Sequence, residues 1–361
     1  MSFPSHPDRF TTAWLERVLG APAGSLISFS AKPVGTGQMS LSFRVTLDWK
    51  HKQGPASIIA KCPSLDAGTR AIAAALRAYA LELGWYRELA PQIGVACPAC
   101  LHLENNDDET DFVLLLQDLA PAQQGDQLAG ATISQIEAAL GQAARLHAPY
   151  WGDARLWRIG WLQPSPNTAA LIRQMAPAVY TQFRQRYAER FAPDVLDLCD
   201  AFIARVGAYF DWKPASFTVQ HRDFRIDNIL FAPGDAEAYV VDWQTLGPGS
   251  GAADVAYLIG TSIADPDVRA REERRLVTLY TEALKALGAA ADAEQIWRDY
   301  RLYAFSGVLM AIIASTNVER TERGDEMFAV MAERPARQAL GLARRIMHPR
   351  RAKCARDGAA E

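Results

Sequence analysis

The stretch VQHRDFRIDNILF, residues 219–231, constrains the fold of this chain more than any other part of the sequence. It places one histidine, two aspartates, two arginines and one asparagine between hydrophobic residues, with Val219 on one side and Ile229 to Phe231 on the other. Burying such charge is costly unless the charged groups are paired or hold a ligand. The fold must therefore bury the two hydrophobic ends of the stretch and give the charged residues between them either partners or a ligand.

The composition is that of an ordinary globular protein. Of the 361 residues, 49% are hydrophobic and 22% are charged, which permits two lobes with a sizeable core. The net charge of −3 gives no general attraction to nucleic acid or to anionic membranes, so we expect neither as a partner. The oligomeric state stays open.

Two further features indicate the cellular setting. The amino terminus lacks the apolar run of a signal peptide, and five cysteines are an odd number for a disulfide framework, so we expect a cytoplasmic protein. The apolar stretch from Leu302 to Ser315 is too short to span a bilayer and predicts a buried helix.

Hydrophobic patterning predicts a small sheet followed by a larger helical region. One helix is expected at about 68–89. Five strands are expected, at 26–34, 41–49, 56–62, 99–104 and 111–119. We therefore expect an α+β, bilobal protein. Its small N-terminal lobe, 1–118, would hold a five-stranded antiparallel sheet with one main helix, and its larger C-terminal lobe, 119–361, would be mostly helical.

Lys61 ends an apolar predicted strand, so its ammonium group needs a partner. In the predicted helix, Tyr79, Glu82, Tyr86 and Leu89 follow the spacing i, i+3, i+7, i+10, which puts Glu82 on the inward stripe. An ion pair between Lys61 and Glu82 would be either structural or a device that aims the lysine at nucleotide phosphates.

A loop with two glycines lies between the first two predicted strands. Gly35 and Gly37 carry no Cβ, so backbone N–H groups could approach a phosphate closely. The surrounding VGTGQMSL fits neither a Rossmann fingerprint nor a P-loop. An ordinary hairpin turn explains the loop about as well as a phosphate site does.

Oxygen-bearing side chains follow two predicted strands. Asp223 and Asn228 lie in a short loop after one strand, and Asp242 ends the next. Mg²⁺ prefers oxygen ligands of this kind. Either segment alone also fits a buried structural network, but their order after a glycine loop, a lysine strand and an acidic helix favours a metal and a phosphoryl group.

In order and spacing, these segments resemble the aminoglycoside phosphotransferase and choline kinase-like superfamily of small-molecule kinases, which has the protein-kinase-like fold. HRDFRIDNILF and VVDWQ are most similar to its ecdysteroid-kinase-like branch, and the resemblance extends from Lys32 to Gly260. It implies transfer of the γ-phosphate of ATP, with Mg²⁺, to a hydroxyl group of a small-molecule alcohol. A catalytically silent nucleotide-binding regulator is the alternative, and a protein kinase ranks behind both.

The resemblance also implies roles for the residues of the charged stretch. Asp223 would be the catalytic base, His221 would organise its loop, and Arg225 would contact the γ-phosphate. Asn228 and Asp242 would hold Mg²⁺.

Upstream, the resemblance implies that Lys61, steadied by Glu82, grips the α- and β-phosphates while Gly35 and Gly37 cover them. Backbone groups of three residues would face adenine: Gln117, Asp118 and Leu119. Asp254 would support the catalytic loop, and His147 is expected to be structural.

Two departures from protein kinases argue against a peptide substrate. Asp242-Trp243-Gln244 replaces Asp-Phe-Gly, so a flipping phenylalanine is not expected. Only WQTLGPGSGAA separates Asp242 from Asp254, which leaves little room for a peptide-docking segment. The acceptor stays unidentified, and the tryptophans at 151, 157 and 161 would either line its pocket or fill the core.

Overall fold

The structure is a computed structural model that describes residues 3–35, 39–51, 54–164, 168–214, 216–235, 237–316 and 320–347. The chain forms two compact units. The first unit comprises residues 1–123 and 239–246, and the second unit comprises residues 124–238 and 247–361. The lobe boundary expected between residues 118 and 119 stays a prediction.

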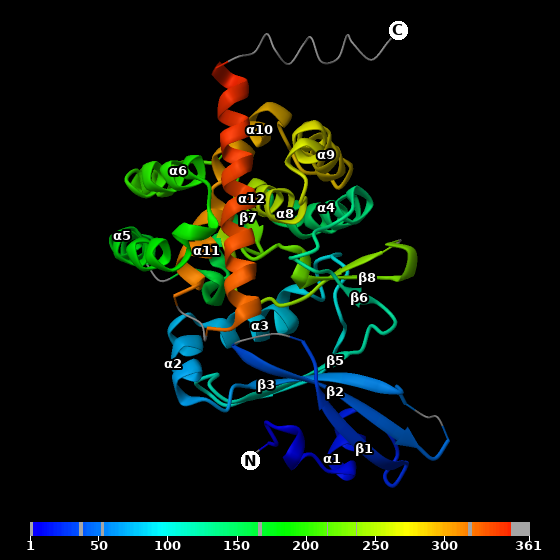
Figure 1. Cartoon of the computed structure of the whole chain (residues 1–361). Coiled ribbons are helices and arrows are strands. Elements are labelled where there is room, and N and C mark those ends of the chain that lie inside the picture. The colour runs from blue at the N-terminus through cyan, green and yellow to red at the C-terminus, as the bar shows by residue number, and fades with distance from the viewer. Residues whose placement is uncertain are drawn as a thin grey trace. The chain divides into compact units, whose positions relative to one another are not determined.

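The first unit is built on a five-stranded antiparallel sheet with the order β1-β2-β3-β5-β4 (Figure 1). Its strands are β1 (Leu26–Pro33), β2 (Ser40–Trp49), β3 (Ser57–Pro63), β4 (Cys100–Asn105) and β5 (Phe112–Gln117). The predicted sheet is thus confirmed. Ile58, Ala60 and Cys62 of β3 belong to a buried cluster with residues of α1 (Thr12–Val18). Because side chains alternate along a strand, Lys61 lies on the opposite face.

The continuous helix expected at about 68–89 is wrong. The segment forms α2 (Ala67–Ala75), α3 (Ala78–Gly84) and a π-helical turn, Trp85–Leu89. Arg77, between α2 and α3, has a left-handed backbone with φ of 57°. The break lets α3 bury Tyr79 and Glu82 while most of α2 stays accessible to solvent.

The second unit is mostly helical, as expected. Its helices are α4 (Ile133–His147), α5 (Thr168–Tyr187), α6 (Pro193–Ile203), α7 (Val206–Asp211), α8 (Gly251–Ser262), α9 (Pro266–Ala286), α10 (Ala293–Tyr303), α11 (Ser306–Ala314) and α12 (Glu322–Met347). α8 is buried along its whole length, and α4, α10 and α12 pack against it (Figure 1). α8 is therefore a rigid support for what lies beside it.

Short strands frame the charged stretch. β7 (Thr218–Gln220) precedes it and pairs antiparallel with β10 (Gly247–Gly249), which leads directly into α8. β8 (Ile229–Phe231) follows it, and β6 (Gln123–Gln124) and β9 (Ala238–Val240) complete the strands. The hydrophobic ends of the stretch are therefore strands, and the charge lies on the loop between them.

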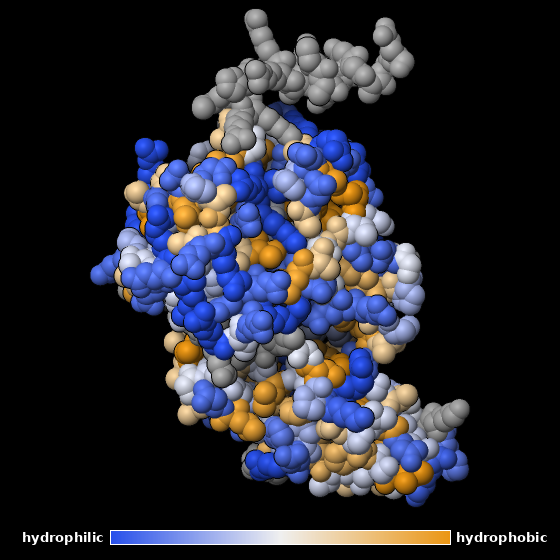
Figure 2. Space-filling model, viewed as in Figure 1, coloured by the Kyte–Doolittle hydropathy of each residue, from blue (hydrophilic) through white to orange (hydrophobic). Residues whose placement is uncertain are grey.

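The apolar stretch Leu302–Ser315, expected to form one buried helix, is divided: its first two residues end α10, and Ser306–Ala314 form α11, whose Val308, Ala311 and Ile312 are fully buried. Among the described residues, no helix is both long enough and apolar enough to cross a bilayer. On the face shown in Figure 2, hydrophilic side chains predominate over the helices of the second unit, and hydrophobic ones are scattered among them.

Candidate functional site

In the first unit, polar side chains gather around Lys61. Its Nζ lies 2.6 Å from Glu82 Oε1 and 3.3 Å from Asp242 Oδ1. Burial by itself would lower the pKa of Lys61, but the two carboxylates outweigh it and raise that pKa above its usual value. The lysine is therefore a cation held in one place, and the expected pair with Glu82 is present.

The segment that carries Asp242 is fixed by an aromatic stack. The rings of Trp243 and Trp85 lie nearly parallel, 14° apart, with their centroids 3.7 Å from each other, and both are fully buried. Asp242 itself has a φ of 68°, a left-handed conformation that is uncommon for aspartate and requires support from its surroundings. The stack supplies that support at the next residue.

The glycine loop is anchored where it ends. Gly35 has a φ of 78°, which suits glycine, and Gly37 lies outside the described residues. At the other end of the loop, the Tyr79 hydroxyl donates to the Met39 carbonyl at 2.6 Å and accepts from the Ser64 N–H at 3.1 Å. The residue that precedes β2 is thus held close to α3.

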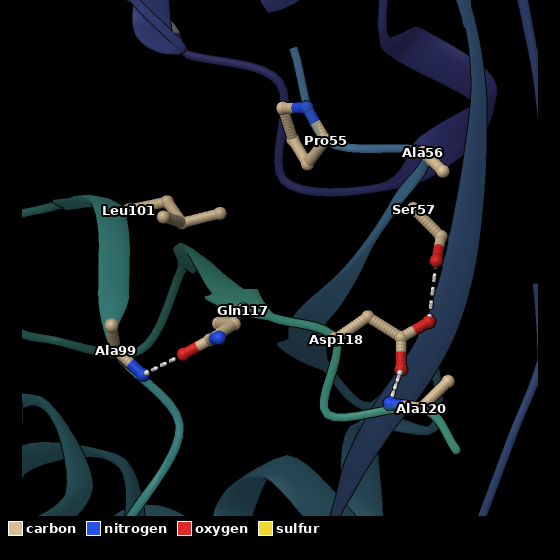
Figure 3. Close-up of a pocket in the computed structure, with 8 residues that line it drawn as sticks. All are labelled: Pro55, Ala56, Ser57, Ala99, Leu101, Gln117, Asp118 and Ala120. Atoms are coloured by element: carbon tan, nitrogen blue, oxygen red, sulfur yellow. Dashed lines mark hydrogen bonds between the residues drawn. The ribbon is translucent and has the colours of Figure 1, made fainter.

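A pocket of about 440 Å³ opens beside the end of β5 (Figure 3), within the size range of small-molecule sites. Eight residues line it: Pro55, Ala56, Ser57, Ala99, Leu101, Gln117, Asp118 and Ala120. Two of the three residues expected to face adenine are therefore in its wall.

The Asp118 side chain holds the end of β5 in place. Its carboxylate accepts hydrogen bonds from Ser57 Oγ at 2.7 Å and from the Ala120 N–H at 3.1 Å (Figure 3), and it pairs with Arg44 at 2.7 Å. Burial would raise the pKa of Asp118, but Ser57 and Arg44 outweigh it and lower the pKa. The carboxylate is thus committed to structural contacts, and only backbone groups are left for a ligand.

Two backbone groups of residues 117–119 already form hydrogen bonds within the protein. The Gln117 N–H donates to the Ala99 carbonyl at 2.9 Å, and the Leu119 carbonyl accepts from the Ala122 N–H at 2.9 Å. That Gln117, Asp118 and Leu119 face adenine stays a prediction.

In the second unit, Asp223 is held by three side chains. Its Oδ1 accepts a hydrogen bond from the Tyr257 hydroxyl at 2.9 Å, its Oδ2 accepts one from Asn228 Nδ2 at 2.8 Å, and Arg225 Nε lies 3.3 Å from Oδ1. Burial would raise the pKa of Asp223, but Arg225 and the other neighbours outweigh it and hold the pKa below its usual value. The carboxylate is ionised and able to accept a proton.

Tyr257 is the residue that sequence reasoning missed. It lies three residues after Asp254 in the apolar segment ADVAYLIG, which reads as a core helix. It is buried on α8, and a buried tyrosine hydroxyl usually finds a hydrogen-bond partner. That requirement was a usable signal, but the sequence does not say that Asp223 is the partner.

Arg225 lies between two carboxylates rather than free. It pairs with Asp223 and, at very short range, with Asp227, whose Oδ1 accepts from the Gln127 N–H at 2.7 Å. Its predicted contact with a γ-phosphate stays a prediction. Asp227 is therefore part of the support of this loop.

Asp254 holds the backbone at the start of the charged loop. Its Oδ2 accepts from the His221 N–H at 2.7 Å and its Oδ1 accepts from the Arg222 N–H at 2.9 Å, while His147 Nε2 lies 3.2 Å from Oδ2. The other ring nitrogen of His147 lies 2.8 Å from the hydroxyl of Tyr280. The side chains of Asp254, His147 and Tyr280 are all fully buried, which agrees with the structural roles expected for Asp254 and His147.

His221 contributes to the same loop. Its Nδ1 accepts a hydrogen bond from the Asp223 N–H at 3.3 Å, and its ring packs edge to face against Phe224. These contacts hold the His221 ring against the loop that carries Asp223.

Two of the predicted residues offer oxygens suited to Mg²⁺. Both side-chain hydrogen bonds of Asn228 are donated by its nitrogen, to Asp223 Oδ2 and to the Asp223 carbonyl, so its amide oxygen is the atom that could serve a metal. Asp242, in the first unit, is partly exposed. Within the described ranges no group of three His, Cys, Asp or Glu side chains could hold a metal, but Mg²⁺ in phosphate sites commonly takes only one or two carboxylates from the protein.

Comparisons with known proteins place these features in context. Residues 69–303 match the model of a family described as "Phosphotransferase enzyme family". No curated protein matches the chain. Solved structures show the same fold at low identity, and the fold class predicted from the sequence is confirmed by them.

Three solved structures illustrate the likeness. The GDP complex of aminoglycoside 2'-phosphotransferase-IIIa has a TM-score of 0.52 at 13% identity, with 91% of this chain and 100% of that chain covered. The ethanolamine kinase of Plasmodium vivax has a TM-score of 0.52 at 13% identity, covering 86% and 83%. The choline kinase of Cryptosporidium parvum has a TM-score of 0.51 at 12% identity, covering 89% and 90%.

Proposed function

Because the chain belongs to the phosphotransferase enzyme family, we propose that it is a kinase that transfers the γ-phosphate of MgATP to a hydroxyl group of a small molecule. The observation that carries this proposal is the contact of Lys61 with both Glu82 and Asp242. It joins three distant segments of the sequence at a cation of the kind that binds phosphates.

We assign the proton transfer to Asp223. An acceptor hydroxyl donates its hydrogen bond to this carboxylate, which orients the oxygen for attack and receives the proton as the phosphoryl group is transferred. Tyr257 and Asn228 keep the carboxylate in a single orientation. Arg225 keeps it ionised, and His221 shapes the loop that presents it.

The nucleotide would be bound mainly through its phosphates. Lys61, aimed by Glu82, binds the α- and β-phosphate oxygens, and the loop with Gly35 and Gly37 covers them. Asn228 and Asp242 would hold Mg²⁺, which supplies charge neutralisation at the phosphates when bound. The base would lie near the backbone of residues 117–119, beside the pocket in Figure 3.

Within the family, the segments HRDFRIDNILF and VVDWQ support placement in the ecdysteroid-kinase-like branch. A catalytically silent nucleotide-binding regulator of the same fold is the alternative. The ionised Asp223, held by three side chains, favours an enzyme, since a regulator has no use for a proton acceptor held in this way.

The proposal is tested by an ADP-release screen. With MgATP present, we expect turnover on at least one member of a chemically broad panel of alcohols, and little on peptides, because the segment between Asp242 and Asp254 is short. Calorimetry with ATP and with GTP, each with Mg²⁺, accompanies the screen. Absence of nucleotide binding at millimolar concentrations would overturn the proposal, and phosphorylation of generic proteins without small-molecule turnover would reverse the choice of acceptor.

Tyr257→Phe is expected to shift the pH dependence of the reaction. It removes one hydrogen bond from the Asp223 carboxylate, so the pKa of Asp223 rises toward its usual value. The carboxylate must be ionised to act as base, so the acid limb of kcat/KM should move to higher pH. Tyr209→Phe is the matched control, since that hydroxyl contacts Ser306 instead. An acid limb that is identical in wild type and Tyr257→Phe would rule out this role.

A further inference from the structure

The side chain of Gln244 joins two parts of the first unit that are far apart in sequence. Its Nε2 donates to Ser40 Oγ at 2.8 Å and to Glu82 Oε2 at 3.2 Å. Gln244, Ser40 and Glu82 are buried, with exposed fractions of 9%, 5% and 1%. Buried polar groups that lose their partner cannot turn to water instead, so this amide is strongly constrained to one position.

Through Glu82, the amide is connected to the lysine. Glu82 accepts from Lys61 with Oε1, at 2.6 Å, and from Gln244 with Oε2. Lys61 in turn contacts Asp242, two residues before Gln244. The contacts therefore form one continuous series from Asp242 through Lys61, Glu82 and Gln244 to Ser40, and a shift in one member displaces the next.

Ser40 is the position at which this series meets the glycine loop. It is the first residue of β2, directly after the loop that starts at Gly35. The preceding residue, Met39, is bound through its carbonyl to the Tyr79 hydroxyl. Two consecutive residues at the end of the loop are thus attached, one to α3 and one to Gln244.

The backbone that presents Gln244 is itself fixed. Trp243, its neighbour, is stacked on Trp85 and fully buried. Glycine, which protein kinases place at the position of Gln244, has no side chain that could reach either partner. The side chain of Gln244 therefore makes two contacts that a glycine could not make, one with Ser40 and one with Glu82.

We propose that Gln244 is a positioning residue for nucleotide phosphates, which holds the end of the glycine loop in register with Lys61 and Glu82. The inference rests on the proposed function and deepens it. Because every contact of the series joins groups of the protein itself, the loop end, the lysine and Asp242 can be assembled before ATP arrives. Binding energy is then not spent on ordering them.

Gln244→Met is the test, because methionine is close to glutamine in size and shape but has no N–H donor. We expect KM for ATP to rise about tenfold, the effect of losing a buried bridge between two groups, while KM for the acceptor stays the same. Gln92→Met is the matched control, since the Gln92 amide lies on the surface and donates to the Glu88 carbonyl of its own segment. Equal KM for ATP in both variants would overturn the proposal.

A double-mutant cycle with Ser40→Ala isolates the bridge. If Gln244 acts through Ser40, the double variant should be no worse than Gln244→Met alone, because the contact is already lost. Fully additive effects on KM for ATP would mean that the two residues act independently, and would overturn the proposal. Melting temperatures of all four proteins identify any variant that fails to fold.

Hydrogen–deuterium exchange in the absence of nucleotide separates this inference from the proposed function. Backbone amides of residues 39–43 should exchange faster in Gln244→Met and in Ser40→Ala than in wild type or Gln92→Met. If wild type binds no nucleotide, the proposed function fails while exchange still reports whether the bridge holds the loop. Faster exchange with unchanged KM for ATP would show a merely structural bridge and contradict the positioning role, and unchanged exchange would contradict the bridge itself.

Discussion

Asp223→Asn is expected to lower turnover by about 10² to 10⁴ while leaving the affinity for MgATP nearly unchanged. The substitution keeps the size of the side chain and removes the charge that accepts the hydroxyl proton. Phosphoryl transfer passes through a loose transition state in most analyses, so the base receives its proton late and mainly orients the hydroxyl. The measurement is a pair, turnover on the acceptor found in the screen and MgATP affinity by calorimetry.

Asp227→Asn is the matched control for this prediction. Asp227 lies four residues away and is the other carboxylate of the charged stretch, but its contacts are to Arg225 and to the Gln127 N–H. We expect a lower melting temperature and a much smaller loss of turnover per folded molecule. Near wild-type turnover in Asp223→Asn, with a large loss in Asp227→Asn, would show that Asp227 is the base and that Asp223 is not.

Asp242→Ala is expected to weaken MgATP binding by about 100-fold and to lower turnover with it. The variant loses an oxygen that could serve Mg²⁺ and also one of the two carboxylates that contact Lys61. Because the remaining partner, Glu82, still holds the lysine, part of the phosphate affinity should persist without metal. Calorimetry with and without Mg²⁺ separates the two contributions.

Asp48→Ala provides the control, since it removes an exposed carboxylate from β2 in the same unit. Its nucleotide affinity should equal that of wild type under both conditions. If Asp242→Ala bound nucleotide with the same dependence on Mg²⁺ as wild type, Asp242 would not be a metal ligand.

The sheet of the first unit was predictable because the residue pattern that marks each strand lies within the strand and its flanking turns. From Phe43 onward β2 alternates buried and exposed side chains, and β5 is a short apolar run; both are bounded by turn residues, so their limits can be read without knowing their neighbours. The helix after β3 shows where local information ends. No glycine or proline marks the break at Arg77, and the turn there follows from what α3 packs against.

The site divides in the same way. The pair between Lys61 and Glu82 was predictable, because a buried lysine needs a partner and helical spacing offered one. The contact between Gln244 and Ser40 spans 204 residues, and nothing in either local sequence specifies it. Tyr257 was hidden for a different reason, since a tyrosine in an apolar helix looks like an ordinary core residue.

The face-to-face stack of Trp85 and Trp243 gives the segment next to Asp242 an optical label of its own. Two indole rings held 14° from parallel at a centroid distance of 3.7 Å are close enough for their electronic transitions to couple, so we expect the pair to contribute a band to the circular dichroism spectrum. That band depends on the mutual orientation of the rings and disappears if they separate. A movement of the chain next to Asp242 that changes how the two rings lie would therefore alter the circular dichroism of the unmodified protein, without an attached dye.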